Sequence, residues 1–557
     1  MSVGVSNRSW GRAIVAGLRR AGAGRFFLSP GARSAPLAAA LGELGDDVTV
    51  HYDERGMAFA ALGWAMATGR PAVCLSTSGS AVANLLPACV EASHSGLPLI
   101  FLTADRPASL RGTGANQTIL QPGIFGAFVR WSVDLPCSED ASEDFGLSGV
   151  LRAAVGCATG DNPGPVHVNV PFREPLLDGD ESRALDVSDA LPVPPAVDFV
   201  LPGDFDFRGF AEARGAVVIG RLAAWEQGEA VDAVRLGAAL GWPVFADALS
   251  GARLMPGVIR HADWILRRDG VPEPERVLHF GGSLISKRVA LWLASCKGRD
   301  CVQVRRFPLR LDPWGQAPVL IQAGVAEFCR AVQEELRPAL GSAWRQDWAS
   351  ADGAVARVLA QHLDGMGPIT EPQVSRSVAK TGVPVFLGNS MPVRDFDSCV
   401  DGNAERTVRL FGNRGASGID GNIAAIAGVA IGVQEPVVAV LGDLAALHDL
   451  NSLPLLSGLP VTLVIINNGG GGIFRFLNLP VEECLLETPH SWNFRHAAAQ
   501  FGIEYHLVAS RGELEARLCE GARGPRVLEC PTDRESNYKL HTAIAAACLL
   551  LDLRWTK

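Results

Sequence analysis

Two stretches determine the architecture of this chain: Val437-Val438-Ala439-Val440-Leu441-Gly442-Asp443-Leu444 and Thr462-Leu463-Val464-Ile465-Ile466-Asn467-Asn468. Each apolar run predicts a buried strand, and the Leu-rich segment 445–456 between them predicts a helix. A strand–helix–strand unit of this kind makes a right-handed crossover, so its two strands are parallel and end at the same edge of one sheet. Open α/β sheets bind their ligands at that edge.

Polar side chains stand where these two strands end. Asp443 follows the first strand and Asn468 closes the second. A carboxylate and an amide oxygen suit a hard divalent cation such as Mg²⁺, which shares its remaining positions with water and phosphate oxygens. The run Gly469–Gly472 follows at once, so the backbone can approach a diphosphate without Cβ clashes. The N-terminus of the intervening helix adds peptide N–H groups for an anion. An α/β crossover with a glycine loop and no ligand is the alternative.

The composition limits the class of protein. The 557 residues carry a net charge of −9, with 48% hydrophobic and 20% charged residues, as in a multidomain globular enzyme. The acidic balance argues against nucleic acid as a partner, and no apolar run is long enough for membrane insertion. The N-terminus lacks a signal-peptide layout, and the 12 Cys include no C-x-x-C pair. We therefore expect a cytoplasmic protein.

Helices and strands alternate along the chain in three blocks. This predicts an α/β fold of three doubly wound parallel-sheet domains, over 1–180, 200–340 and 355–557. The acidic, Pro-rich segment 178–202 predicts a linker. Ser-Gly-Leu-Pro occurs at 95–98 and again at 457–460, each time before a predicted strand with a polar end. The repeated context suggests duplicated α/β domains.

The Gly-Asp…Asn pattern resembles the signature of thiamine-diphosphate (ThDP) enzymes, in which Mg²⁺ or Mn²⁺ anchors the cofactor's diphosphate. The resemblance implies that Asp443, the Asn468 side chain and the Gly470 carbonyl bind the metal. Leu444 stands where the signature usually has Gly. Such enzymes also need a carboxylate beside the cofactor's pyrimidine nitrogen, and Glu54 in His51-Tyr52-Asp53-Glu54-Arg55-Gly56 is placed between a strand and a helix for that role. The simpler interpretation is that Asp53 and Glu54 only favour a helix N-terminus.

Further motifs resemble one ThDP family along most of the chain. They are Ser29-Pro30-Gly31-Ala32-Arg33-Ser34, Thr77–Leu85, Thr103-Ala104-Asp105-Arg106-Pro107, Gly114-Ala115-Asn116-Gln117, Gly388-Asn389-Ser390, Val393-Arg394 and Asn413-Arg414-Gly415-Ala416-Ser417-Gly418-Ile419-Asp420-Gly421. The family is 2-succinyl-5-enolpyruvyl-6-hydroxy-3-cyclohexene-1-carboxylate (SEPHCHC) synthase, of menaquinone and phylloquinone biosynthesis. Ala32 departs from the Ser that the family often has, and Gly469 and Gly472 replace larger polar residues.

The resemblance implies roles for particular residues. Glu54 would be catalytic, as the cofactor-activating carboxylate. Other cofactor-binding positions would be Thr77, Ser78, Ser390, Met391, Ser417, Ile419, Asp443, Leu444, Asn468, Gly470 and Ile473. The substrate-binding positions would be Arg33, Arg106, Asn116, Gln117, Lys287, Arg288, Arg394 and Arg414. Guanidinium groups grip carboxylates in a bidentate manner and stay charged when desolvated, which suits dicarboxylate substrates.

The resemblance also implies a reaction. ThDP-dependent decarboxylation of 2-oxoglutarate would be followed by 1,4-addition of the succinyl carbanion to isochorismate, giving SEPHCHC and CO₂. The active enzyme would be a homodimer or tetramer with its active site at the subunit interface. Two alternatives stay open. Another ThDP enzyme acting on 2-oxoacids would not need the four arginines at 33, 106, 394 and 414 together, and a non-catalytic ThDP-binding sensor would not need Glu54.

Overall fold

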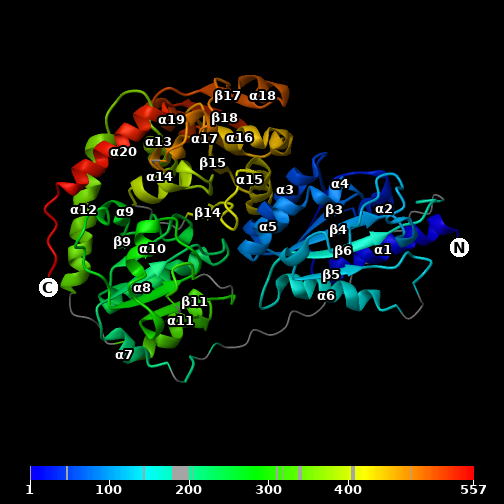
Figure 1. Cartoon of the computed structure of the whole chain (residues 1–557), viewed down its shortest axis with the longest axis horizontal. Helices are drawn as coiled ribbons and strands as arrows, with labels where there is room; N and C mark the ends of the chain where they lie inside the picture. Colours follow the sequence, from blue (N-terminus) through cyan, green and yellow to red (C-terminus); the bar gives the residue numbers. More distant parts are fainter. Residues whose placement is uncertain are drawn as a thin grey trace. The chain divides into compact units, whose positions relative to one another are not determined.

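The chain forms three sheets of six strands each, and every strand pairs in parallel with its neighbours (Figure 1). The structure is a computed structural model that describes residues 2–45, 48–141, 145–178, 199, 201–203, 205–308, 312–316, 318–336, 342–402, 408–477 and 479–556. The predicted fold class is thereby confirmed. The chain divides into two compact units, which are Met1–Ala196 with Asn413–Gln434 and His448–Leu456, and Val197–Gly412 with Glu435–Leu447 and Ser457–Lys557.

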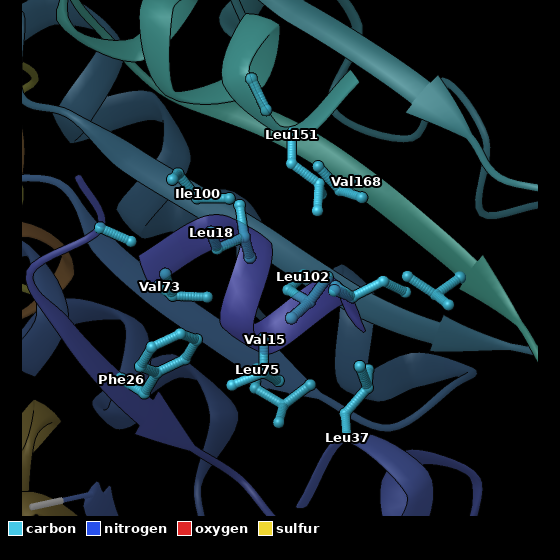
Figure 2. Packing of buried hydrophobic residues seen from close by; sticks show 14 of the residues in the cluster. Val15, Leu18, Phe26, Leu37, Val73, Leu75, Ile100, Leu102, Leu151 and Val168 are labelled. Carbon is cyan, nitrogen blue, oxygen red and sulfur yellow. The ribbon is translucent and has the colours of Figure 1, made fainter. Parts of the chain in front are cut away.

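The N-terminal sheet has the strand order β2-β1-β3-β4-β6-β5. Its strands are β1 (Arg25–Leu28), β2 (Val48–Val50), β3 (Ala72–Ser76), β4 (Leu99–Asp105), β5 (Trp131–Asp134) and β6 (Val166–Pro171). The helices of this part are α1 (Val3–Arg20), α2 (Ala35–Leu44), α3 (Glu54–Thr68), α4 (Ser80–Ala83), α5 (Leu86–Ser95) and α6 (Leu147–Thr159). Figure 2 shows one face of the sheet, where Leu18 of α1 and Leu151 of α6 pack on Ile100 and other buried strand residues.

The other face of this sheet is covered by a second layer of helices in the same unit. There α3 packs closely against α15 (Asn422–Val433), which comes from much later in the chain. Glycines make the close approach possible. A Cβ at Gly63 would lie 2.0 Å from the Ala425 carbonyl oxygen, and a Cβ at Gly428 would lie 1.9 Å from that of Ala60. The two helices therefore meet backbone to backbone.

The middle sheet has the order β12-β11-β10-β7-β8-β9, which is the doubly wound order 3-2-1-4-5-6 read from its other end. Its strands are β7 (Gly215–Ile219), β8 (Val244–Ala246), β9 (Val258–Ile259), β10 (Arg276–Phe280), β11 (Cys301–Arg305) and β12 (Val319–Gln322). Its helices are α7 (Phe207–Ala211), α8 (Ala230–Leu240), α9 (Ala262–Ile265), α10 (Lys287–Leu293), α11 (Val325–Val332) and α12 (Ala343–Leu363). Most of the predicted linker 178–202 lies outside the described residues.

The C-terminal sheet has the order β14-β13-β15-β16-β18-β17, which is the same relative order as in the N-terminal sheet. Its strands are β13 (Val385–Leu387), β14 (Leu410–Phe411), β15 (Val437–Gly442), β16 (Val461–Asn467), β17 (Glu504–Leu507) and β18 (Arg526–Pro531). The remaining α-helices are α13 (Glu371–Ala379), α14 (Met391–Cys399), α16 (Asp443–His448), α17 (Glu483–Leu486), α18 (Arg495–Gln500), α19 (Arg511–Cys519) and α20 (Arg534–Leu549).

Short 3₁₀ helices join several of these elements. They are η1 (Ala32–Ser34), η2 (Ala108–Leu110), η3 (Gly126–Phe128), η4 (Gln227–Glu229), η5 (Ala248–Ser250), η6 (Gly298–Asp300), η7 (Gln333–Glu335), η8 (Leu450–Leu456) and η9 (Gly472–Leu477). The single helix expected over 445–456 is wrong, because α16 ends at His448 and η8 follows with Pro454 inside it. Proline lacks the N–H that a continuous α-helix needs. No helix within the described ranges is both long and apolar enough to cross a bilayer.

Candidate active site

The ends of β15 and β16 lie side by side, as the sequence predicts. Gly442 pairs with Ile466, so Asp443 and Asn468 both come at the carboxyl edge of the sheet. Asp443 is 2% exposed, and its Oδ2 accepts the backbone N–H of Gly470 at 2.9 Å. Burial raises the pKa of Asp443, against the hydrogen bonds from Gly470 and Leu444 that favour the charged form. A buried carboxylate of this kind gains from a bound cation.

The two polar atoms of the Asn468 side-chain amide differ in their hydrogen bonding. Its Nδ2 donates to Oε1 of Glu371 at 2.9 Å, and its buried Oδ1 has no hydrogen-bond partner among the residues that the structure describes. A buried acceptor destabilises the folded protein unless it binds a hydrogen-bond donor or a cation. Oxygen donors are what Mg²⁺ and Mn²⁺ prefer. The residues present therefore fit the divalent metal.

The glycine loop brings backbone close to these two side chains. Gly469 and Gly470 have φ of +74° and +148°, a region that residues with a side chain rarely adopt. A Cβ at Gly470 would also lie 2.5 Å from the Glu487 carbonyl oxygen. The loop is fixed by Arg534, whose Nη1 donates to the Gly469 carbonyl at 2.9 Å. Glycine is therefore required where the sequence predicts the third metal ligand.

A second strained turn precedes α14. Ser390 has φ +71°, and Nη1 of Arg394 donates to its carbonyl at 2.6 Å. Non-glycine residues at positive φ cost free energy and gather at functional sites. Five occur in the described part of the chain, and three of them, Gln117, Ser390 and Ser417, are predicted site residues. Backbone strain therefore coincides with positions chosen from sequence alone.

A pocket of about 520 Å³ opens between the middle and C-terminal parts of the second unit. It is lined by five predicted residues, which are Lys287, Arg288, Met391, Arg394 and Ile473. The sequence analysis missed Arg267, Tyr538 and His541, which also line it, together with Trp264, Phe476 and Leu477 among others. The four cations from 267, 287, 288 and 394 make this pocket suitable for an anionic ligand.

Some of these cations have acidic neighbours. Arg288 Nη1 lies 3.0 Å from Oδ2 of Asp263, which also lines the pocket. His541 Nε2 lies 3.1 Å from Oδ1 of Asp395. A cluster of basic residues at 267–268 was visible in the sequence but carried no motif, and α20 gave no signal at all. The contribution of such residues to the pocket can be recognised only from the structure, in which the fold brings them to one cavity.

Glu54 lies in the other unit, at the first position of α3. Asp53 caps that helix by accepting the N–H groups of Arg55 and Gly56. This leaves the Glu54 side chain to other partners, and Nδ2 of Asn84 lies 3.4 Å from its Oε2. Asp53 therefore caps the N-terminus of α3, which the simpler interpretation assigned to Asp53 and Glu54 together. Glu54 stays half-buried and accessible to a ligand.

Three of the predicted residues meet in front of β4. The Nη1 of Arg106 donates to the Ser78 hydroxyl and, at 2.6 Å, to the Gln117 carbonyl, and Gln117 Nε2 donates to the Ser78 carbonyl at 3.0 Å. Burial, followed by the charge of Arg33, lowers the pKa of Arg106. Thr77, next to Ser78, is buried, and its hydroxyl has no hydrogen-bond partner within the described ranges. Asn116 stands exposed on the neighbouring loop.

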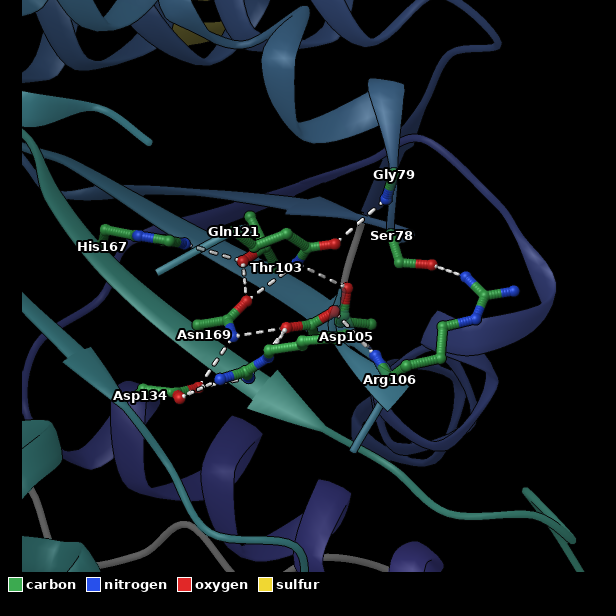
Figure 3. A network of polar contacts seen from close by, with 11 residues as sticks. Ser78, Gly79, Thr103, Asp105, Arg106, Gln121, Asp134, His167 and Asn169 are labelled. Atoms are coloured by element: carbon green, nitrogen blue, oxygen red, sulfur yellow. Dashed lines mark hydrogen bonds and ion pairs between the residues drawn. The ribbon is translucent and has the colours of Figure 1, made fainter. Parts of the chain in front are cut away.

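Figure 3 shows the buried polar network behind this cluster. Asn169 Nδ2 donates to Asp105 at 3.0 Å, and Gln121 links Asn169 to the backbone N–H of Gly79. Asp105 Oδ1 in turn accepts the backbone N–H of Arg106 at 2.7 Å. The turn that carries Ser78 and the strand end that carries Arg106 are thereby fixed relative to each other. This network was not predicted.

Arg33 is 7% exposed and is held at both ends of its guanidinium. Nη1 donates to the Phe172 carbonyl at 2.9 Å, and Nη2 lies 2.7 Å from Oε1 of Glu174. Glu174 itself is mostly exposed. A substrate carboxylate at Arg33 therefore has to share or replace Glu174.

The segment 413–421 of the first unit is shaped by a buried carboxylate. Glu91 of α5 accepts the backbone N–H groups of Gly415 at 2.6 Å, Ala416 at 2.7 Å and Ser417 at 3.3 Å. Ser417 has φ +62°, and Ile419 just beyond it is 41% exposed. Arg414 lies on the same segment and is partly exposed. An exposed isoleucine held on a rigid loop is available to contact a ligand.

Comparison with known proteins agrees with this geometry. Residues 8–124 match the family model described as thiamine pyrophosphate enzyme, N-terminal TPP binding domain. Residues 201–384 match the middle domain of thiamine pyrophosphate enzymes, and 402–530 match their C-terminal TPP binding domain. A SEPHCHC synthase of Rubrobacter xylanophilus is 43% identical over 96% of this chain and 97% of its own length. The chain belongs to the SEPHCHC synthase family.

Other members of the SEPHCHC synthase family are similar over the same extent. Those of Salinibacter ruber and Halobacterium salinarum are 37% and 36% identical, each over 97% of this chain and over 96% and 98% of their own lengths. The family resemblance seen in the motifs is confirmed, and ThDP is the cofactor of this chain. The roles of individual residues stay predictions. The structure brings them together in two groups, one in each unit.

Proposed function

We propose that this chain is a SEPHCHC synthase that converts 2-oxoglutarate and isochorismate to SEPHCHC and CO₂ in menaquinone or phylloquinone biosynthesis. Bound ThDP supplies the carbanion chemistry, in which 2-oxoglutarate loses CO₂ and its remaining four carbons add to the acceptor. The observation that carries the proposal is the buried, unpartnered Oδ1 of Asn468 beside the buried carboxylate of Asp443. Together with the family membership, this supports a metal–diphosphate anchor at the end of β15 and β16.

In this proposal the chain holds the cofactor at both ends. Asp443, the Asn468 side chain and the Gly470 carbonyl bind Mg²⁺ or Mn²⁺. Glu54 holds a proton at the cofactor's pyrimidine nitrogen, as a hydrogen-bonded carboxyl group. The remaining contacts are assigned to Thr77, Ser78, Ser390, Met391, Ser417, Ile419, Leu444 and Ile473. Each lies on a loop or in the first turn of a helix, close to where binding groups concentrate.

The cations orient the substrates. Both substrates carry two carboxylates, and charge-assisted contacts to Arg are strong and directional. We assign Lys287, Arg288 and Arg394 to this role because they line one pocket. Arg33, Arg106, Asn116, Gln117 and Arg414 are assigned to it by the family resemblance, and the hydrogen bonds among Arg106, Ser78 and Gln117 support that grouping.

The two alternatives are less well supported. A ThDP enzyme for small 2-oxoacids does not need a pocket with four cations. A non-catalytic binder has no use for a half-buried carboxylate at the start of α3 that takes no part in capping it. We also propose a homodimer or tetramer, with Glu54 and the metal ligands of one active site on different subunits, as the family resemblance implies.

CO₂ release from 2-oxoglutarate tests the proposal. The purified chain with ThDP and Mg²⁺ should release CO₂ slowly from 2-oxoglutarate alone and much faster when isochorismate is added. Mass spectrometry should identify SEPHCHC in the second case. Release of CO₂ that isochorismate does not accelerate would favour a simple decarboxylase. Binding of ThDP without any turnover would favour the sensor.

A further inference from the structure

Strand β16 ends at Asn467 and Asn468 follows it directly, and each of these asparagines donates its side-chain N–H to a buried glutamate. Asn467 Nδ2 donates to Oε1 of Glu529 at 2.7 Å, and Asn468 Nδ2 donates to Oε1 of Glu371 at 2.9 Å. Glu529 belongs to β18, the neighbour of β16, and is 2% exposed. Glu371 is the first residue of α13 and is 1% exposed. The chain thus contains a matched pair of Glu–Asn contacts.

The two contacts differ in what the other amide atom does. Asn467 Oδ1 accepts the backbone N–H of Gly469 at 3.2 Å, so both ends of that amide are satisfied within the protein. Asn468 Oδ1 is buried and has no hydrogen-bond partner in the described part of the chain. One pair therefore serves the fold alone. The other pair holds an amide oxygen in a position where it can bind a ligand.

We propose that Glu371 is a positioning residue, which fixes the Asn468 amide so that its oxygen, and not its nitrogen, faces the metal. The inference rests on the proposed metal site. The two ends of an amide have nearly the same shape, and a half-turn about the last side-chain bond exchanges them. A carboxylate accepts hydrogen bonds but does not donate them, so it selects the NH₂ end. The oxygen is then left for the cation.

The surroundings of Glu371 are built to hold it in one place. It opens α13, where the backbone N–H of Thr370, the residue before it, donates to Oε1 of Gln373 at 3.1 Å. The Thr532 hydroxyl donates to the same Oε1 at 3.4 Å. On the far side, a Cβ at Gly472 would lie 2.9 Å from Asn468 Nδ2, so only glycine leaves room for the amide. The position of Nδ2 is therefore defined from several sides.

The affinity for Mn²⁺ tests this role without any measurement of turnover. Free Mn²⁺ is measured by electron paramagnetic resonance during titration of the full-length protein with saturating ThDP. Loss of a partner that orients a metal ligand typically weakens metal binding about 10- to 100-fold. We therefore expect Glu371→Ala to bind Mn²⁺ at least tenfold more weakly than the wild type. Glu371→Gln keeps an acceptor at the same reach and should stay within about threefold.

Two further variants distinguish the effect of the carboxylate's position from the effects of its charge and of fold stability. Glu371→Asp keeps the carboxylate but shortens the side chain, so we expect it to bind Mn²⁺ as weakly as is expected for Glu371→Ala. This variant provides the test if Glu371→Ala does not fold. Glu529→Ala breaks the matched contact to Asn467, so it should lower the melting temperature but leave Mn²⁺ affinity within about twofold of wild type.

Several results would overturn the inference. Wild-type Mn²⁺ affinity in Glu371→Asp or in folded Glu371→Ala would show that Asn468 orients itself. Equal weakening in Glu371→Gln would show that charge, and not the acceptor position, matters. Equal weakening in Glu529→Ala would indicate a general effect of fold stability. If the wild-type protein with ThDP binds no Mn²⁺, the proposed metal site itself is wrong, which is a different failure.

Discussion

The Glu91 carboxylate accepts the backbone N–H of Ala416 at 2.7 Å, although 325 positions separate the two residues in the chain. The same carboxylate binds the N–H groups of Gly415 and Ser417. A helix of the N-terminal part thereby shapes the loop that carries Arg414 and Ile419. The ligand contacts predicted for this loop therefore depend on the position of Glu91.

Glu91→Ala should therefore disturb the loop. Hydrogen bonds to a charged group contribute about 1.5–3 kcal/mol each, and the variant removes several at once. We expect a lower melting temperature and an affinity for ThDP that falls by about tenfold or more. Calorimetry measures both. Ser95→Ala is the control, because it removes the hydroxyl that donates to the same carboxylate at 2.8 Å but leaves the bonds of Glu91 to the loop backbone, and it should change little. Unchanged ThDP binding in folded Glu91→Ala would contradict the prediction.

Glu54→Gln should keep the fold and bind ThDP but activate it poorly. Roles of this acid–base kind typically contribute about 10²–10⁴-fold to a rate. Deuterium exchange at the cofactor's C2 position, followed by NMR after rapid quenching, should be slower by that factor. Asp53→Asn is the matched control, since asparagine also caps helices and the exchange rate should hold. An exchange rate in Glu54→Gln equal to that of the wild type would rule out the role.

Asp443→Ala should fail to retain Mg²⁺ and ThDP, because the diphosphate loses its bridge to the protein. Neither this variant nor Glu54→Gln should turn over alone. If the active site lies between subunits, co-expression of the two variants should restore activity, because each mixed dimer has one site with neither substitution. With random pairing, roughly a quarter of wild-type activity is expected. No recovery in mixed dimers, isolated with two different tags, would place both residues of one site on a single subunit.

The enzyme should prefer 2-oxoglutarate strongly over pyruvate. Loss of one charge-assisted contact costs about 1.5–3 kcal/mol, or roughly ten- to hundredfold in kcat/KM. Pyruvate lacks the second carboxylate and leaves a cation in the pocket unpaired. Arg394→Ala should lower kcat/KM for 2-oxoglutarate by a similar factor while ThDP affinity holds. Arg268→Ala, outside the pocket lining, is the control. Equal kcat/KM for the two oxoacids would point to the general 2-oxoacid enzyme.

His167 should make a contribution to stability that is lost below neutral pH. Burial lowers the pKa of His167 to about 4, from an ordinary value of 6.5. The unfolded chain therefore binds the proton between these two values when the folded chain does not, so stability is complete above pH 6.5 and decreases toward pH 4. From pH 7 to pH 5 the loss is about 2 kcal/mol. Urea denaturation of His167→Gln should show a smaller loss than the wild type, whereas the exposed His94→Gln should match it.

The sequence was enough for the sheets because parallel strands buried on both faces are continuous apolar runs. Val437–Leu441 and Thr462–Ile466 were placed as neighbouring strands, and β15 and β16 pair in that way. The Ser-Gly-Leu-Pro repeat indicated duplication, and the N-terminal and C-terminal sheets share one strand order. Helix continuity was harder to predict. Pro454 interrupts the segment after α16, although its apolar pattern continues.

The site was predictable only where a motif marked it. Asp443, Asn468 and Gly470 follow strands directly, and the strained turns at Ser390 and Ser417 lie within motifs. Glu371, Glu91 and Arg267 had no such mark. Glu371 and Glu91 bond to residues far away in the sequence, and Arg267 is brought to the pocket lining only by the fold. Hydrogen bonds of that kind depend on tertiary packing, which periodicity and spacing do not encode.

The shared strand order has an evolutionary consequence. In each of the two sheets, the third strand along the chain and the fourth lie side by side, and the first residue beyond each is a predicted site residue. These residues are Thr77 and Arg106 in one sheet and Asp443 and Asn468 in the other. The roles predicted for the two edges differ, because Arg106 is assigned to a substrate and Thr77 to the cofactor, whereas Asp443 and Asn468 are assigned to the metal ion. New substrates can therefore be acquired by mutations in one repeat, while selection keeps the ancient anchoring function intact in the other.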